Sequence, residues 1–150
     1  MIERAQDPYD WPGVLDLIRR AFAGMEGRID PPSSLHRLTV SGVEDQARTG
    51  EVWVDAPLRA CMFLTVKPGR LYLGKLAVAP KLQGRGLARG MMAKAEARAR
   101  ALGLAVLQLE TRVELVENHA VFQKLGFIET DRKAHQGFDR PTSITFEKRV

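Results

Sequence analysis

The residues best suited to chemistry lie in one short glycine-rich segment, Gln83-Gly84-Arg85-Gly86-Leu87-Ala88, between an expected strand and an expected helix. The first turn of a helix has free backbone N–H groups and a partial positive charge. Glycine lets the backbone come close to a bound anion, and Arg85 and Arg89 would add positive charge beside it. The segment therefore predicts a cradle for a phosphate or pyrophosphate, although a plain tight turn would use the same glycines.

The distribution of charge favours the same interpretation. The chain has 23 Lys and Arg against 18 Asp and Glu, for a net charge of +5. The segment from Lys81 to Arg100 holds six basic residues and one acidic residue, so it alone accounts for that excess. Basic domains often bind nucleic acid, but one basic segment that begins at a glycine turn suits a compact polyanion better. Nucleic acid is therefore not expected as a partner.

Three classes of phosphate-binding loop can be compared with this segment. The mononucleotide P-loop needs Gly-x-x-x-x-Gly-Lys-Ser/Thr, which the sequence lacks. The dinucleotide fingerprint, Gly-x-Gly-x-x-Gly, fits Gly84 and Gly86, but position 89 is Arg and the next glycine is Gly90. The third class has the pattern Gln/Arg-x-x-Gly-x-Gly/Ala, and here it is Gln83-x-x-Gly86-x-Ala88.

This third pattern resembles the loop of the GNAT superfamily, the Gcn5-related N-acetyltransferases. Leu76-Ala77-Val78-Ala79-Pro80 before the loop also resembles that family, and its second characteristic region is similar to Asn118, Phe122 and Leu125-Gly126-Phe127. The resemblance implies an acetyl-coenzyme A-dependent N-acetyltransferase that transfers acetyl directly to an amine through a tetrahedral intermediate. The acceptor would be a small-molecule amine or a peptide N-terminus, and no metal would be needed.

The resemblance also implies how acetyl-coenzyme A would be bound. Backbone groups of Leu76, Ala77 and Val78 would pair with the pantetheine arm in the manner of an added strand. The N–H of Val78 would stabilise the oxyanion. Asn118 would face the cofactor, although asparagine is equally suited to a helix N-cap. The pyrophosphate would lie on Gln83, Gly84, Arg85, Gly86, Leu87, Ala88 and Arg89.

The general acid and base are less evident. Phe122 stands where the family commonly has a tyrosine that protonates the leaving thiolate, and it has no hydroxyl. A thiol pKa near 8.5 still makes the thiolate a fair leaving group. Tyr72 lies where some members place a glutamate or histidine, and a packed strand aromatic is the alternative. Glu114 is a candidate base or amine anchor, with a solvated ion pair as its alternative.

The acceptor is expected to meet Arg112, Glu114 and His135, which follow the second central strand or precede the last strand. Arg112 could bind a substrate carboxylate with two parallel hydrogen bonds, and His135 could line the acceptor pocket or be exposed. Because no acid and base are clearly paired, the alternative function is a catalytically weak acyl-coenzyme A-binding sensor or interaction module.

The spacing of apolar residues predicts the elements that position this site. We expect helices over 11–22, 33–38, 87–102 and 118–125, and a turn at 41–45 that enters another short helix. Strands are expected over 2–5, 51–55, 59–67, 71–78, 104–109, 128–132 and 143–147. Strand, glycine loop, helix and strand form one βαβ crossover, so 71–78 and 104–109 should be parallel. The expected fold is α+β: a mixed, mostly antiparallel sheet flanked by helices, with the splayed central parallel strands that the GNAT resemblance implies.

The composition of the chain indicates its domain organisation and its expected location. The chain of 150 residues is 45% hydrophobic and 27% charged, which is typical of one globular domain over 1–150. The single cysteine, Cys61, excludes a disulfide framework and a multi-cysteine zinc site. No apolar run reaches the ~18 residues that cross a bilayer, and the first residues lack the apolar core of a signal peptide. We therefore expect a cytoplasmic protein without a membrane partner, and a homodimer is compatible with the resemblance.

Overall fold

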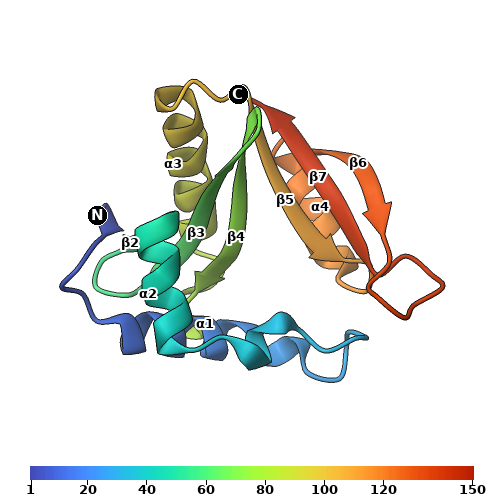
Figure 1. Cartoon of the computed structure of the whole chain (residues 1–150), viewed down its shortest axis with the longest axis horizontal. Helices are drawn as coiled ribbons and strands as arrows, with labels where there is room; N and C mark the ends of the chain where they lie inside the picture. The colour runs from blue at the N-terminus through green and yellow to red at the C-terminus, as the bar shows by residue number, and fades with distance from the viewer.

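The computed structural model describes residues 1–150 and places seven strands in one sheet, with helices on both of its faces (Figure 1). The strand order is β1-β2-β3-β4-β5-β7-β6. The strands are β1 (Ile2–Ala5), β2 (Glu51–Asp55), β3 (Ala60–Lys67), β4 (Arg70–Val78), β5 (Val106–Arg112), β6 (Ile128–Lys133) and β7 (Ser143–Arg149). The helices are α1 (Trp11–Phe22), α2 (Val40–Thr49), α3 (Leu87–Ala101) and α4 (Val116–Lys124), with short 3-10 turns at Ala23–Met25, Ser34–Arg37 and Pro80–Leu82.

Only β4 and β5 are parallel neighbours; the other strand pairs are antiparallel. The chain passes from β4 through α3 to β5, and such a crossover is the ordinary way to join parallel neighbours. The predicted α+β class, the mostly antiparallel sheet and the single βαβ crossover are therefore confirmed.

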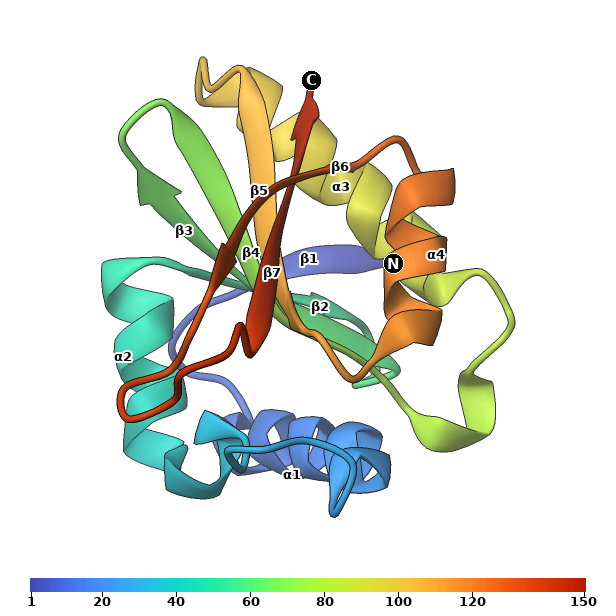
Figure 2. The same cartoon turned by 90° about the vertical axis from the view of Figure 1, so that its right-hand side faces the viewer.

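Two hydrophobic cores cover the two faces of the sheet. On one face α3 presents Met91, Met92, Ala95 and Ala99 to a cluster that includes Leu71, Leu73, Leu107 and Leu109. On the other face the apolar side of α1 packs over strand residues that include Val52, Val54 and Cys61. Figure 2 shows α1 and α2 together on one side of the sheet and α3 and α4 on the other. Burial of these apolar stripes is what holds the helices in place.

The ends of α1 and α3 follow from their sequences. The Asp10 side chain accepts a hydrogen bond from the N–H of Gly13 at 3.0 Å and so caps α1, as N-cap aspartates commonly do. Gly86 precedes α3 with φ 82°, and Gly103 follows it with φ 72°. Both angles lie in the left-handed region that glycine adopts without a steric penalty.

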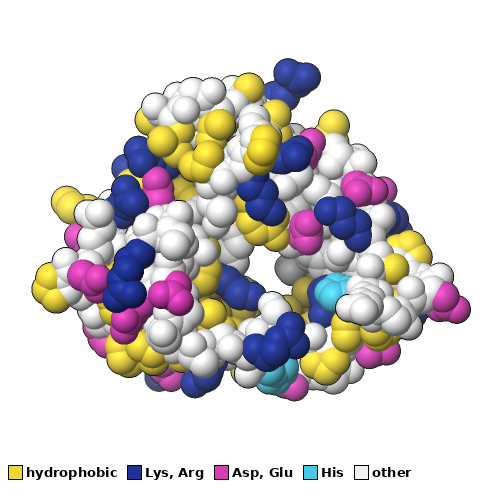
Figure 3. Space-filling view, in the orientation of Figure 1, with side chains coloured by type: hydrophobic (Ala, Val, Ile, Leu, Met, Phe, Trp, Pro, Cys, Tyr) yellow, Lys and Arg dark blue, Asp and Glu magenta, His cyan; other side chains and the backbone are white.

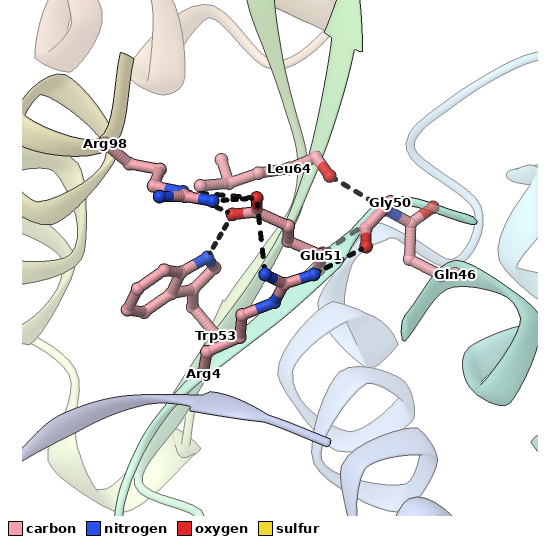
Figure 4. Close-up of polar contacts among 7 residues, drawn as sticks. All are labelled: Arg4, Gln46, Gly50, Glu51, Trp53, Leu64 and Arg98. Carbon is pink, nitrogen blue, oxygen red and sulfur yellow. Dashed lines mark hydrogen bonds and ion pairs between the residues drawn. The ribbon is translucent and has the colours of Figure 1, made fainter. Parts of the chain in front are cut away.

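A buried polar cluster ties β1, β2 and α3 together (Figure 4). The side chain of Glu51 is only 9% exposed and accepts hydrogen bonds from the guanidinium of Arg98 and from the indole N–H of Trp53. Arg4 of β1 lies 3.8 Å from the same carboxylate. Nearby, the side-chain amide of Gln46 donates to the carbonyl of Leu64 at 3.1 Å. Arg98, Trp53 and Arg4 thus satisfy the Glu51 carboxylate, which would be costly to bury alone.

Several expected elements differ in detail. The predicted helix at 33–38 is a 3-10 turn over Ser34–Arg37, and residues 41–45 belong to α2, which begins at Val40 with Thr39 as its cap. All of Glu51–Asp55 except Trp53 is buried, because α1 and α2 lie over one face of β2 and α3 lies over the other. The strand predicted at 104–109 begins later and ends later in the structure, where β5 runs from Val106 to Arg112. The helix predicted at 118–125 begins two residues earlier, at Val116.

Candidate functional site

The site begins where β4 and β5 separate. Their pairing spans only four residues on each strand, from Arg70 opposite Val106 to Leu73 opposite Leu109. Beyond this point β4 continues to pair with β3 and β5 continues to pair with β7. The β3–β4 register shifts between Cys61 and Phe63, so β4 carries a bulge at its divergence from β5. Bulges bend a strand and increase its twist, which explains the wedge between the two central strands.

A cleft of about 1400 Å³ occupies this wedge. It reaches past both faces of the sheet, because residues of α3 and α4 line one part and residues of the α1–α2 connection line another. Figure 3 shows it as a hollow in the middle of the molecule, with Lys, Arg and His side chains around its rim. The cleft-lining residues among those predicted are Tyr72, Leu76, Ala77, Val78, Gln83, Gly84, Gly86, Leu87, Ala88, Arg89, Arg112, Asn118, Phe122 and His135. The cleft is not lined by Arg85 or Glu114.

The backbone of β4 presents hydrogen-bonding groups to the cleft. The N–H of Ala79 donates to the carbonyl of Arg59 at 2.8 Å, and Val78 is the next residue, opposite Ala60. Bonded and non-bonded pairs alternate along an antiparallel ladder, so the N–H of Val78 points away from β3 and into the wedge. The Val78 carbonyl accepts a hydrogen bond from the Gln83 side chain at 3.3 Å. Gln83 thus joins the strand edge to the glycine loop.

The glycine loop forms an open N-terminus for α3. Gly84 and Gly86 have φ of 81° and 82°, and no other atom lies within 4 Å of the position where a Cβ of either residue would stand. The first N–H groups of α3 have no side-chain cap, so they are free for an anion. The space and the free donors fit a pyrophosphate, as the sequence indicates.

On the other wall, α4 presents Asn118 and Phe122 to the cleft. Leu115 is the N-cap residue of α4, and the N–H of Asn118 donates to the Leu115 carbonyl at 3.0 Å. The N-cap alternative for Asn118 is therefore wrong, and its side chain is available to a ligand. Phe122 packs with ring centroids 6.1 Å from Phe127 and 6.0 Å from Phe146, so it forms an apolar wall.

Tyr72 and Glu110 lie on the neighbouring strands β4 and β5 near the end of their pairing, and both line the cleft. Burial, with a further contribution from the charge of Glu110, raises the pKa of Tyr72 to about 12. The ammonium of Lys67 lies 4.2 Å from the centre of the Tyr72 ring. Glu110 is 33% exposed and its carboxylate lies 3.6 Å from the Lys133 ammonium. The phenol therefore stays protonated near neutral pH, while Glu110 offers an accessible carboxylate.

Arg112 and Glu114 hold the connection between α1 and α2. The Arg112 guanidinium donates to the carbonyls of Pro31 and Pro32 at 2.6 and 3.1 Å. The Glu114 carboxylate accepts from the N–H of Asp30 at 3.0 Å. The structure thus gives Glu114 a partner in the loop and places it outside the cleft lining. Glu114 therefore does not form the solvated ion pair that the sequence offers as its alternative role.

Two further ion pairs fasten the same connection to the far side of the cleft. The Arg28 guanidinium lies 2.6 Å from the Glu117 carboxylate of α4, and Arg140 lies 3.4 Å from Asp30. His135, in the β6–β7 loop, contacts the Thr142 hydroxyl through Nδ1 and lines the cleft. The α1–α2 connection therefore forms the wall of the cleft on the face of the sheet opposite α3.

Sequence reasoning places Glu110 at the end of a central strand, where a substrate could reach, but gives it no role, and it misses Lys75 altogether. Glu110 was expected just beyond a strand that in fact continues through it, so its place on the cleft wall was hidden by the strand boundary. Lys75 is a charged residue inside an apolar strand, and that exception to the pattern is the signal that could have found it. The contacts of the α1–α2 connection join residues more than 80 positions apart, which no local pattern reveals.

Comparisons with known proteins agree with this geometry. A model of the acetyltransferase (GNAT) family matches residues 14–127. Similar structures include the ribosomal-protein-S18-alanine N-acetyltransferase of Escherichia coli, with TM-score 0.75 and 20% identity over 100% of this chain and 93% of that chain. A GNAT family acetyltransferase of Elizabethkingia anophelis with acetyl-CoA bound has TM-score 0.73 and 17% identity over 100% and 97% of the two chains. No curated protein sequence matches the chain significantly.

An acetyltransferase of Streptococcus agalactiae also has TM-score 0.75, with 20% identity over 100% of this chain and 98% of that chain. At these identities the likeness to solved structures concerns the fold. Because the family match covers most of the chain, the protein belongs to the acetyltransferase (GNAT) family, as the sequence predicts. The structure contains no group of three or more side chains arranged to hold a metal ion. None of its helices combines the length and the apolar character needed to span a membrane.

Proposed function

We propose that the protein transfers the acetyl group of acetyl-coenzyme A to an amine, by direct attack of the amine on the thioester. The observation that carries this proposal is the meeting of two features in one cleft: the unpaired edge of β4 at Val78 and the open N-terminus of α3 at Gly86. The first can pair with an extended amide-containing chain, and the second can hold a pyrophosphate. A coenzyme A molecule contains both groups in that order.

The fit of acetyl-coenzyme A can be stated residue by residue. Leu76, Ala77 and Val78 would pair with the pantetheine arm. The pyrophosphate would lie against Gly84, Gly86 and the first turn of α3, including Leu87 and Ala88. Gln83 would act by holding the loop on the strand edge, and Arg89, Asn118 and Phe122 would line the remaining walls. Arg85 lies outside the cleft lining, so it would contribute charge at the rim rather than a direct contact.

In this proposal Glu110 is the general base. Its carboxylate would accept, directly or through one water, the proton that the attacking amine loses. The nitrogen–carbon bond forms, the carbon–sulfur bond breaks, and the N–H of Val78 stabilises the charge that develops on the carbonyl oxygen. The coenzyme A thiolate then leaves, and the protonated phenol of Tyr72 can donate a hydrogen bond to it, while the proton taken up by Glu110 passes to the thiolate or to solvent. In this scheme Glu114 positions the α1–α2 connection.

The alternative function is an acyl-coenzyme A-binding sensor or interaction module, and the absence of a hydroxyl at Phe122 favours it. Two measurements separate these functions. Calorimetry should show acetyl-coenzyme A binding, and a thiol-release assay over a panel of amines should show acceptor-dependent release of coenzyme A. Binding without release for every amine would support the sensor, and no binding below ~1 mM would exclude both. The single domain over 1–150, the cytoplasmic location and the possible homodimer stay predictions.

A further inference from the structure

Lys75 lies at the point where β4 leaves β5. Its backbone has φ 49°, a left-handed conformation that is uncommon for any residue but glycine. The side chain lines the cleft, and its ammonium donates to the hydroxyl of Ser34 at 3.3 Å. Because Ser34 belongs to the α1–α2 connection, Lys75 points to the acceptor side of the sheet, away from α3 and the glycine loop. The cation is therefore placed where an acceptor, rather than the pyrophosphate, would meet it.

The charge of Lys75 is not balanced by the protein. Burial lowers the pKa of its ammonium, and no carboxylate contributes an opposing effect. Its side-chain partner is the neutral hydroxyl of Ser34. Lys75 is half-buried, and partly removing a cation from water without a counter-ion costs free energy. A negative group that arrived in the cleft would remove this cost, so the geometry favours an anionic ligand beside Lys75.

The other charged groups on this side of the cleft agree. Of the two carboxylates that line the cleft, Glu117 is already paired with Arg28 at 2.6 Å, which leaves Glu110. The guanidinium of Arg112 is held by two proline carbonyls, and its Nη1 is buried without a partner. Glu110 is partly exposed and pairs with Lys133 at 3.6 Å, a residue outside the cleft lining, so the cleft-lining groups on this side have an excess of positive charge. The cations that line this side are Arg28, Arg37, Lys75 and Arg112.

We propose that the acceptor is an amine that also carries a carboxylate, with Lys75 and Ser34 binding the carboxylate while Glu110 receives the amine. This inference rests on the proposed acetyltransferase function. A carboxylate carries one negative charge and so matches a single ammonium, whereas a phosphate monoester brings about −1.5 to −2. The atoms balance as in any acetyl transfer: the amine loses a proton to Glu110, gains the acetyl group, and coenzyme A leaves. The acceptor carboxylate takes no part in bond making.

The test compares matched acceptors in the thiol-release assay. Glycine, L-leucine, L-phenylalanine and 4-aminobutyrate are each measured beside the corresponding carboxamide, which keeps the amine and removes the charge. O-phosphoethanolamine serves as the phosphate-bearing arm. We expect kcat/KM for at least one amino acid to exceed that for its amide by tenfold or more, and phosphoethanolamine to be a poorer acceptor than that amino acid.

Variants assign this preference to Lys75. Lys75→Met should bring the acid-to-amide ratio close to one, mainly through a higher KM for the acid, and Lys75→Arg should restore part of the ratio because it keeps the charge. The matched control is Lys94→Met: Lys94 lies on α3, outside the cleft lining, with its ammonium 5.1 Å from the centre of the Trp53 ring. That variant should keep the wild-type ratio. Circular dichroism and acetyl-coenzyme A calorimetry on each variant exclude misfolding and loss of cofactor binding.

The outcomes are distinguishable. Amides acetylated as well as the acids would overturn the inference while the acetyltransferase function stands. A preference for the acids that persists in Lys75→Met would also overturn it, because another cation would then bind the carboxylate. If phosphoethanolamine is the best acceptor, the carboxylate is the wrong anion. Release from no amine at all, with acetyl-coenzyme A still bound, would defeat the proposed function and this inference together.

Discussion

Arg98 of α3 donates three hydrogen bonds, of 2.7 to 3.1 Å, to the carboxylate of Glu51 on β2. The pair joins residues 47 positions apart and fixes the helix that follows the glycine loop against the sheet. Its geometry, with two guanidinium nitrogens on one carboxylate, is the strong form of this interaction. The stability of the whole site therefore depends on a contact that lies outside the cleft.

Replacing Arg98 should destabilise the protein substantially. Arg98→Met leaves the carboxylate of Glu51 buried with only Trp53 and the more distant Arg4, and breaking a buried pair typically costs about 3 kcal/mol or more. Urea unfolding measures the loss. The matched control is Arg100→Met on the same helix, where the guanidinium is 60% exposed and 3.9 Å from Glu96. This control should change stability by less than about 0.5 kcal/mol; equal losses would contradict the role given to the pair.

The lowered pKa of Glu51 leads us to expect that the protein loses stability against unfolding in acid. Burial alone would raise the pKa of Glu51, but the hydrogen bonds from Arg98 and Trp53 and the charge of Arg98 lower it below its usual 4.5. A carboxyl whose pKa is lower in the folded state adds stability above its unfolded pKa, and this is lost as the pH falls through the folded value. Urea midpoints measured from pH 7 to pH 3 should therefore fall more steeply for the wild type than for Glu51→Gln. Parallel curves would show that another carboxyl dominates, with Asp55 as the next candidate because its pKa is also lowered.

The glycine loop predicts an order of effects on cofactor binding. Gly86→Val should weaken acetyl-coenzyme A binding by 100-fold or more, about 3 kcal/mol, because a β-branched residue resists φ 82° and its Cβ enters the space left for the phosphate. Arg89→Ala should cost less, since it removes one partly solvated charge. Calorimetry measures both.

The control for this experiment is Gly103→Val at the other end of α3, where φ is 72° and the surroundings are equally open. It introduces comparable backbone strain far from the loop and should leave acetyl-coenzyme A binding within about twofold of wild type. If Arg89→Ala weakens binding more than Gly86→Val, side-chain charge rather than the backbone forms the cradle.

The assignment of the base predicts a contrast between two glutamates. Glu110→Gln should lower kcat by about 100-fold or more, the usual contribution of a positioned base, and should leave acetyl-coenzyme A binding unchanged. Glu114→Gln should lower kcat less, because its carboxylate contacts the N–H of Asp30 outside the cleft. Steady-state kinetics with the best acceptor provide the test. A larger loss for Glu114→Gln would return the catalytic role to Glu114, as the sequence alone suggests.

The protonated phenol of Tyr72 is expected to act as a hydrogen-bond donor to the leaving thiolate. With a pKa of about 12 the phenol does not ionise near neutral pH, so it cannot act as the base there. Tyr72→Phe should lower kcat by about 10-fold to 100-fold, from loss of the hydrogen bond to the charged thiolate. Tyr9→Phe is the matched control, since Tyr9 packs on Trp11 outside the cleft. An unchanged kcat for Tyr72→Phe would mean that the thiolate leaves without help from this hydroxyl.

The sequence predicted the fold and the cofactor side of the cleft better than the acceptor side. The crossover, the loop and Val78 lie in one continuous stretch, so local patterns place them together. The acceptor side is assembled from long-range contacts, such as that of Arg112 with Pro31. Apolar spacing also could not locate the end of β5, because Glu110 and Arg112 are polar residues within a strand.

The cleft is lined from both faces of the sheet, and this has a consequence for the order of events in a catalytic cycle. Acetyl-coenzyme A would enter beside α3, whereas the amine would enter beneath the α1–α2 connection. With the reactants placed in this way, neither would have to pass the position of the other, so we expect no obligatory order of arrival. In the proposed reaction the spent coenzyme and the acetylated product would also leave by separate routes, so the slower departure would set the turnover rate without blocking the other.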